Sequence, residues 1–142
     1  MPKFTYGKQS EFNLIDVHPK LVRHFRYALS LGVYDIVIID GIRTLKEQEY
    51  NVLKRVSKTM NSKHLRQVSG YSEAIDSLPW PDFDWNAPGA DRDLIMYLAW
   101  HQGVADGQKL IKLRTGNDWN MNNKNSDNKF QDLDHAEILL NA

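Results

Sequence analysis

Two histidines, His64 and His135, lie in polar segments beside carboxylates that could share a metal ion with them. His64 is followed by Asp76, and His135 stands in the run DLDHAE at residues 132–137, which places four ionisable side chains in six residues. Two histidines with one carboxylate form a recurrent catalytic zinc set that leaves a fourth position for water. Such a water becomes a nucleophile near neutral pH, and Asp132 could take its proton. From spacing alone, both histidines could equally be ordinary surface residues.

The other three histidines are better explained by structure than by chemistry. His18 precedes the proline that opens a predicted helix, and His24 is placed on the polar side of that helix, so we expect a capping residue and a surface residue. His101 follows Trp100 in a later predicted helix, where both are expected to be structural. The chain has no cysteine, which excludes thiolate nucleophiles, iron–sulfur clusters and cysteine-type zinc sites. Any metal site must therefore be built from histidine and carboxylate.

The elements that must position these residues are helices interleaved with short strands. Apolar residues at helical spacing predict three main helices, at residues 19–31, 45–55 and 91–107. Short apolar or β-branched runs predict strands at residues 36–39, 74–76, 110–113 and 135–140. Polar or turn-rich composition predicts loops at residues 57–73, 77–89 and 116–129. We therefore predict an α+β fold, with three main helices packed on a short antiparallel sheet that carries the site.

The predicted helix at residues 45–55 has a recognisable start. Thr44 and Glu47 have the spacing of a capping box, which explains both residues without any catalytic role. The apolar residues of this helix are Leu45, Val52 and Leu53, and we expect them to make its contacts with the rest of the protein.

Length and composition limit the function classes. The chain has 142 residues, 42% hydrophobic and 25% charged, which predicts one globular domain over residues 1–142. Eighteen basic and eighteen acidic side chains cancel, so we expect no nucleic-acid partner. No stretch approaches the roughly 18 consecutive apolar residues of a membrane span, and residues 1–13 lack the apolar core of a secretory signal. We expect a monomer made in the cytoplasm, without membrane insertion.

Four blocks of the sequence resemble, in the same order, the motifs of phage L-alanyl-D-glutamate endopeptidases, which belong to the zinc D-Ala-D-Ala carboxypeptidase superfamily. GIRTLKEQ at residues 41–48 is similar to G-x-R-T-x-x-E-Q, and SKTMNSKHL at residues 57–65 is similar to S-x-T-x-x-S-x-H-L. AID at residues 74–76 resembles the end of S-x-H-x-x-G-x-A-x-D, and DLDHAE at residues 132–137 resembles D-L-P-H-F-E. Each block alone is weak, but together they are specific, and the similarity extends from about Val17 to Ile138.

The resemblance implies a role for each matched residue. Asp132 would be the general base, and Arg43 would pair with a substrate carboxylate or stabilise the developing oxyanion with its planar fork. Ser62 and Glu137 would orient the site from behind the metal ligands. The implied zinc ligands are His64, Asp76 and His135.

The resemblance also implies a substrate and a biological setting. The substrate would be the stem peptide of bacterial peptidoglycan, with the L-Ala–D-Glu bond favoured, and the setting would be phage lysis. The enzyme would accumulate in the host cytoplasm and reach the periplasm or wall after the membrane is permeabilised. Two alternatives remain open. One is a D-Ala-D-Ala carboxypeptidase with the same chemistry, and the other is a non-catalytic wall-binding relative with a disrupted site.

One departure from the family pattern bears directly on the metal site. The family places its aspartate seven residues after the first histidine, whereas twelve residues separate His64 from Asp76 here. The additional residues fall at positions 66–72. They could loop out, with Gly70 allowing a sharp turn, or they could move Asp76 away from the metal.

Two loops carry further candidates. Alternate oxygen-bearing residues at Asp118, Asn120 and Asn122 resemble the D-x-D-x-D spacing of calcium loops, although two of the three are amides, which predicts at most weak calcium binding. A solvated loop is the simpler interpretation. Trp80 and Trp85 follow Asp76 in a proline-rich segment, and we expect at least one of them to line a substrate cleft.

Overall fold

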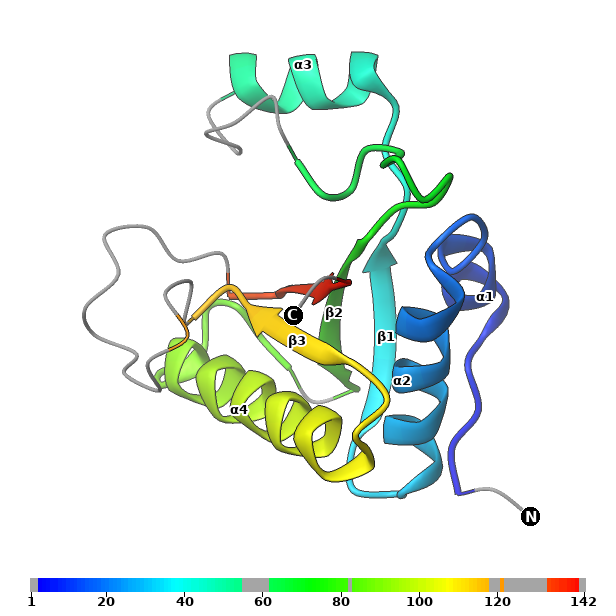
Figure 1. The fold of residues 1–142 in the computed structure, drawn as a ribbon. Coiled ribbons are helices and arrows are strands. Elements are labelled where there is room, and N and C mark those ends of the chain that lie inside the picture. Colours follow the sequence, from blue (N-terminus) through cyan, green and yellow to red (C-terminus); the bar gives the residue numbers. More distant parts are fainter. Residues whose placement is uncertain (1–2, 55–61, 82, 118–120, 122–132, 141–142) are drawn as a thin grey trace.

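The computed structural model describes residues 3–54, 62–81, 83–117, 121 and 133–140. Within these ranges the chain forms four helices and one four-stranded sheet, which confirms the α+β class (Figure 1). A short N-terminal helix, α1, adds to the three that the sequence predicted. The helices are α1 (Lys8–Asn13), α2 (Pro19–Ser30), α3 (Leu45–Leu53) and α4 (Ala90–Gln108), and the strands are β1 (Asp35–Asp40), β2 (Ala74–Trp80), β3 (Lys112–Thr115) and β4 (His135–Leu139). None of these helices is long and apolar enough to cross a membrane.

The sheet is antiparallel throughout, in the order β1-β2-β4-β3. Asp76 in β2 pairs with Asp40 in β1 on one side and with His135 in β4 on the other. The register of β1 and β2 shifts between Ile38 and Asp40, and such irregularities re-aim side chains near functional sites. Asp40, Asp76 and His135 therefore lie side by side across three neighbouring strands.

Two of the strands differ from the predicted bounds by more than one residue. β2 continues through Ser77 to Trp80, and β3 begins at Lys112 rather than two residues earlier. The proline in β2 misled the prediction, because proline normally interrupts a central strand. Pro79 is tolerated because β2 pairs with β4 only over Ala74–Asp76, so at Pro79 its partner is β1 alone.

Helices α2 and α4 contribute the apolar residues that cover the sheet's inner face, and they meet through a buried pair of histidines. His24 and His101 are both 0% exposed, with His24 Nε2 2.9 Å from His101 Nδ1. The surface position predicted for His24 is wrong, because this side chain lies three residues after Leu21 on the buried face of α2. The core also includes Leu21, Phe25, Ile36, Ile38, Ile75, Leu94, Tyr97, Leu98, Leu113, Ala136 and Ile138.

The histidine pair predicts acid sensitivity. The amide nitrogen of Gln108 lies 2.7 Å from His24 Nδ1, so the three groups form a chain of hydrogen bonds with both rings neutral. Burial lowers the pKa of His24 to about 4, and burial together with His24 lowers the pKa of His101. Below pH 6.5 the unfolded state therefore binds more protons, and stability falls as the pH falls. His24 alone is expected to cost about 3 kcal/mol between pH 6.5 and 4.

Urea unfolding of the metal-free protein between pH 7 and 4.5 measures this loss. The double variant His24→Leu/His101→Leu should show a flatter dependence on pH than the wild type, whatever its absolute stability. Equal slopes for the double variant and the wild type would contradict the prediction.

Helix α3 lies apart from α2 and α4, beyond the end of β1 (Figure 1). The predicted capping box is confirmed, with Thr44 and Glu47 each bonding the other's backbone N–H. The predicted apolar contacts are wrong for Leu45 and Leu53, which are 58% and 82% exposed. The buried residue of α3 is the polar Gln48, so α3 joins the body through a hydrogen-bond network rather than an apolar face.

Candidate metal centre

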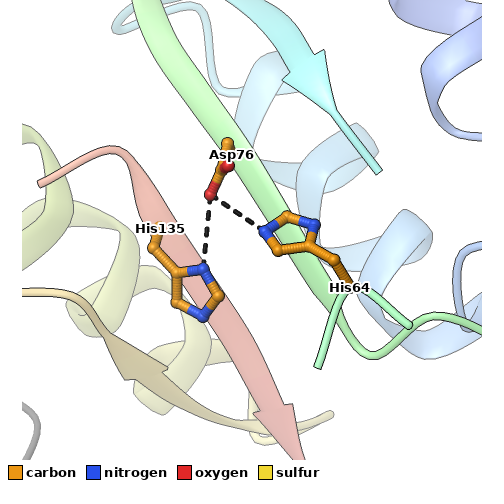
Figure 2. A group of neighbouring side chains, drawn as sticks. All are labelled: His64, Asp76 and His135. Atoms are coloured by element: carbon orange, nitrogen blue, oxygen red, sulfur yellow. Dashed lines mark hydrogen bonds and ion pairs between the residues drawn. The ribbon is translucent and has the colours of Figure 1, made fainter. Parts of the chain in front are cut away.

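His64, Asp76 and His135 converge where β2 pairs with the start of β4, as Figure 2 shows. Asp76 Oδ1 lies 3.1 Å from His64 Nε2 and 3.3 Å from His135 Nδ1, and the three donor atoms lie within 4.8 Å of one another. All three residues are buried, at 2%, 8% and 5% exposed in chain order. Two ligands about 2.1 Å from a tetrahedral metal lie about 3.4 Å apart, so the spacing fits one shared ion.

Each of the three side chains is placed by a different element. Asp76 belongs to the central strand β2, and His135 is its cross-strand neighbour at the start of β4, so both side chains share one face of the sheet. His64 comes from the loop before β2, where its carbonyl accepts a hydrogen bond from Arg43 N (2.9 Å). Ser62 Oγ accepts from His64 N (3.1 Å), so Ser62 shapes the backbone that carries the histidine.

The additional residues 66–72 loop out without displacing Asp76. They form a tight turn in which Gln67 N bonds Tyr71 O and Gly70 N bonds Gln67 O, each at 2.9 Å. Gly70 has φ +88°, a conformation that favours glycine. The tip of the turn, Val68, is fully exposed. The additional residues between His64 and Asp76 therefore form an exposed turn and leave the two side chains close together.

Hydrogen bonds behind the two imidazoles decide which ring nitrogens face Asp76. His64 Nδ1 lies 2.7 Å from the carbonyl oxygen of Gly41, which can only accept, so Nδ1 carries a proton and Nε2 is the nitrogen turned to Asp76. His135 Nε2 lies 2.9 Å from Glu137 Oε1 and donates to it, so Nδ1 is the nitrogen turned to Asp76. Such partners behind a metal-binding histidine fix its tautomer and ring orientation.

The result is three candidate ligand atoms aimed at one point. Burial opposes ionisation of Asp76, but the charges of His64 and His135 and their hydrogen bonds outweigh it and hold the pKa of Asp76 well below its usual range. Burial likewise opposes ionisation of Glu137, and His135 with Arg114 lowers its pKa. Once a divalent cation displaces the protons that face Asp76, the ionised carboxylate and the two imidazoles form a suitable set of ligands for it.

Arg43 lies beside this centre and is firmly anchored. Its Nη1 donates to Gln48 Oε1 (2.6 Å), its Nε donates to Asp40 Oδ2 (3.2 Å), and its Nη2 lies 3.7 Å from Asp76 Oδ2. The side chain is 11% exposed and borders a cavity of about 410 Å³ together with Lys46 and other residues of α3. This arrangement connects α3 to the metal ligands, and the substrate contact expected of Arg43 stays a prediction.

Several sequence predictions concern residues that are not described. Asp132 lies outside the described residues, so its role as the base stays a prediction from the sequence. The loop from Asp118 to Asn122 also lies outside them apart from Met121, and the weak calcium site expected in this loop stays a prediction as well. Trp80 and Trp85 are 57% and 52% exposed, but Trp80 lies at the opposite end of β2 from Asp76. Their expected place in a cleft also stays a prediction, whereas Trp100 packs against the core as predicted.

Gly41 is a site residue that the motif contained but to which sequence reasoning assigned no role. A Cβ atom there would overlap the carbonyl oxygen of Asn13 and lie 2.9 Å from Val17 Cγ2. Gly41→Ala is expected to lower the free energy of unfolding by about 1–3 kcal/mol and to weaken metal binding, because the Gly41 carbonyl orients His64.

Urea unfolding and metal titration of the Gly41→Ala protein test this expectation. Gly103→Ala is the matched control, because Gly103 lies within α4 and a Cβ there meets no atom within 4 Å. This control is expected to gain about 0.5–1 kcal/mol from the higher helix propensity of alanine. Gly41→Ala protein with wild-type stability and metal affinity would refute the proposed role.

A small α+β domain that brings two histidines and one carboxylate together carries the residue set of single-metal hydrolytic centres. A more specific assignment comes from sequence similarity. The family model of phage L-alanyl-D-glutamate peptidases matches residues 2–139, and the chain belongs to this family.

Two relatives illustrate the similarity. The chain is 36% identical over 121 residues to the L-alanyl-D-glutamate peptidase of Escherichia phage T5, an alignment that covers 82% of each chain. Its fold is similar to the crystal structure of the Serratia marcescens L-Ala D-Glu endopeptidase ChiX, with a TM-score of 0.65 and 22% identity. That alignment covers 95% of this chain and 90% of the Serratia chain, and it supports the fold.

Proposed function

We propose that this chain is a zinc-dependent peptidase that hydrolyses the L-Ala–D-Glu bond in the stem peptide of bacterial peptidoglycan. Membership of the peptidase family supports the choice of bond. The observation that carries the proposal is the convergence of His64, Asp76 and His135 on one point, with each imidazole held in the tautomer that binds a metal.

The residues around this point have separable tasks. Zinc held by His64, Asp76 and His135 would polarise the scissile carbonyl and make a water molecule nucleophilic near neutral pH. Asp132 would take a proton from the attacking water and would pass it to the leaving amine. Arg43, already oriented by its bonds to neighbouring side chains, pairs with a substrate carboxylate or with the developing oxyanion.

The same proposal gives the enzyme a place of action. It would be made in the host cytoplasm and would reach the periplasm or cell wall once the membrane is permeabilised. The D-Ala-D-Ala carboxypeptidase and the non-catalytic wall-binding protein are the alternatives that the experiment must separate.

Product analysis on purified muropeptides tests the proposal. With zinc, the expected product is a peptide with a new N-terminal D-Glu, leaving L-Ala on the muramic acid. Chelation should stop the reaction, and zinc should restore it. Release of D-Ala would show the carboxypeptidase. Binding to isolated walls with stoichiometric zinc but no cleavage would show the wall-binding protein, and the absence of any zinc binding would reject the metal centre.

A further inference from the structure

Arg114 occupies a position behind the metal centre that no motif predicted. It lies in β3 directly opposite Glu137 in β4, and Arg114 Nη2 is 2.8 Å from Glu137 Oε2. The sequence placed this strand two residues too early, so Arg114 fell outside it. The correct bounds put Arg114 on the sheet face that carries the site, between the buried Leu113 and Thr115.

Glu137 uses its two carboxylate oxygens for two different partners. Oε1 accepts from His135 Nε2 at 2.9 Å, and Oε2 accepts from Arg114 at 2.8 Å. The Glu137 side chain is only 4% exposed, whereas that of Arg114 is 33% exposed. A nearly buried carboxylate is costly without a cation, and in the described part of the chain Arg114 is the arginine that contacts it.

We propose that Arg114 is a positioning residue for the metal centre, acting on His135 through Glu137. The chain Arg114–Glu137–His135 joins three side chains from two neighbouring strands and ends at the nitrogen turned to Asp76. Without Arg114 the carboxylate of Glu137 loses the partner of Oε2 and turns toward water. His135 then loses the acceptor that holds its proton on Nε2, and its Nδ1 is no longer fixed toward Asp76.

A simpler role for Arg114 would be a cross-strand ion pair that only stabilises the edge strand β3. The two roles predict different measurements. An ion pair of that kind changes the stability of the metal-free protein and leaves its intrinsic zinc affinity unchanged. A positioning role changes the zinc affinity and the proton position on His135. The inference rests on the proposed function only in taking zinc as the resident metal.

The experiment compares Arg114→Gln, Arg114→Lys and Arg26→Gln by zinc titration against a competing chelator. Arg114→Gln is expected to weaken zinc binding about 10- to 100-fold, the range for loss of a partner behind a metal ligand. Arg114→Lys keeps the positive charge but lacks the planar guanidinium group, so it should recover part of the zinc affinity. Arg26→Gln breaks an ion pair of similar length with Glu11, between α1 and α2, and should bind zinc like the wild type.

Nitrogen-15 NMR of the zinc-free protein, recorded at a pH where the His135 ring is neutral, gives a second readout. His135 should carry its proton on Nε2 in the wild type and Arg26→Gln, and should show a mixture of tautomers in Arg114→Gln. Zinc affinity of Arg114→Gln within twofold of the wild type, with an unchanged tautomer, would overturn the inference. Both measurements are independent of catalysis, so wild-type protein that binds zinc but leaves muropeptides intact would reject the proposed activity and not the role of Arg114.

Discussion

Replacing His64 with alanine is expected to reduce both zinc affinity and peptide hydrolysis by at least about 100-fold, the upper end of what even an indirect metal partner costs. His64 supplies one of the three converging donor atoms, and it enters from the loop before β2 with its Nε2 3.1 Å from Asp76 Oδ1. With that nitrogen gone, two donors remain, which is fewer than the three protein ligands of a catalytic zinc site.

Zinc titration and muropeptide hydrolysis, measured on the same preparation, test the loss. His18→Ala is a matched control, because His18 caps α2 by accepting from Lys20 N and takes no part in the metal centre. It is expected to lose about 0.5–2 kcal/mol of stability while binding zinc normally. Wild-type zinc affinity in the His64→Ala protein would remove this histidine from the ligand set.

Replacing Asp132 with asparagine is expected to lower kcat by about 10²- to 10⁴-fold while zinc remains bound. Three of the described carboxylates near the ligands are already engaged. Asp76 faces both imidazoles, Glu137 bonds His135 and Arg114, and Asp40 bonds Arg43. A base must be able to accept a proton from water, and we propose Asp132 for this role because it matches the aspartate of the family motif.

Comparison of zinc content with turnover separates a base from a ligand. Asp84→Asn makes the same chemical change in a loop where the side chain accepts from Asn86 N, a bond that asparagine can keep. This variant should hydrolyse muropeptides within about threefold of the wild-type rate, as surface changes usually do little. Loss of zinc from the Asp132→Asn protein would instead make Asp132 a ligand, and undiminished turnover would exclude it as the base.

The three candidate metal ligands could be selected from the sequence because they stand in short local patterns, and the structure brings them together. His64, Asp76 and His135 each belong to a block whose residue types and order are recognisable without coordinates. The capping box of Thr44 and Glu47 was predictable for the same reason, since both partners lie within one helical turn. Helices and strands with clear periodicity were likewise placed to within a few residues.

What the sequence missed depends on partners far apart in the chain. Histidine is a polar residue, so the sequence suggested a surface position for His24. Only the packing of α2 against α4 shows that it is buried beside His101. Leu45 and Leu53 are apolar, so the sequence suggested that they make the contacts of α3. Both are exposed, and α3 is instead connected through the hydrogen bond between Gln48 and Arg43. A single strand does not reveal which of its residues face a neighbour that lies elsewhere in the sequence.

The sequence by itself determined the family, the α+β class and the three side chains that can bind a metal, because these follow from residue types at short spacing. Tertiary structure decided how those side chains are held. The Gly41 carbonyl behind His64, the pair of Glu137 and Arg114 behind His135, and the outward turn of residues 66–72 all arise from chain segments meeting in space. Hydrogen bonds act over about 3 Å, so their partners are known only when the sheet has set the register of its strands.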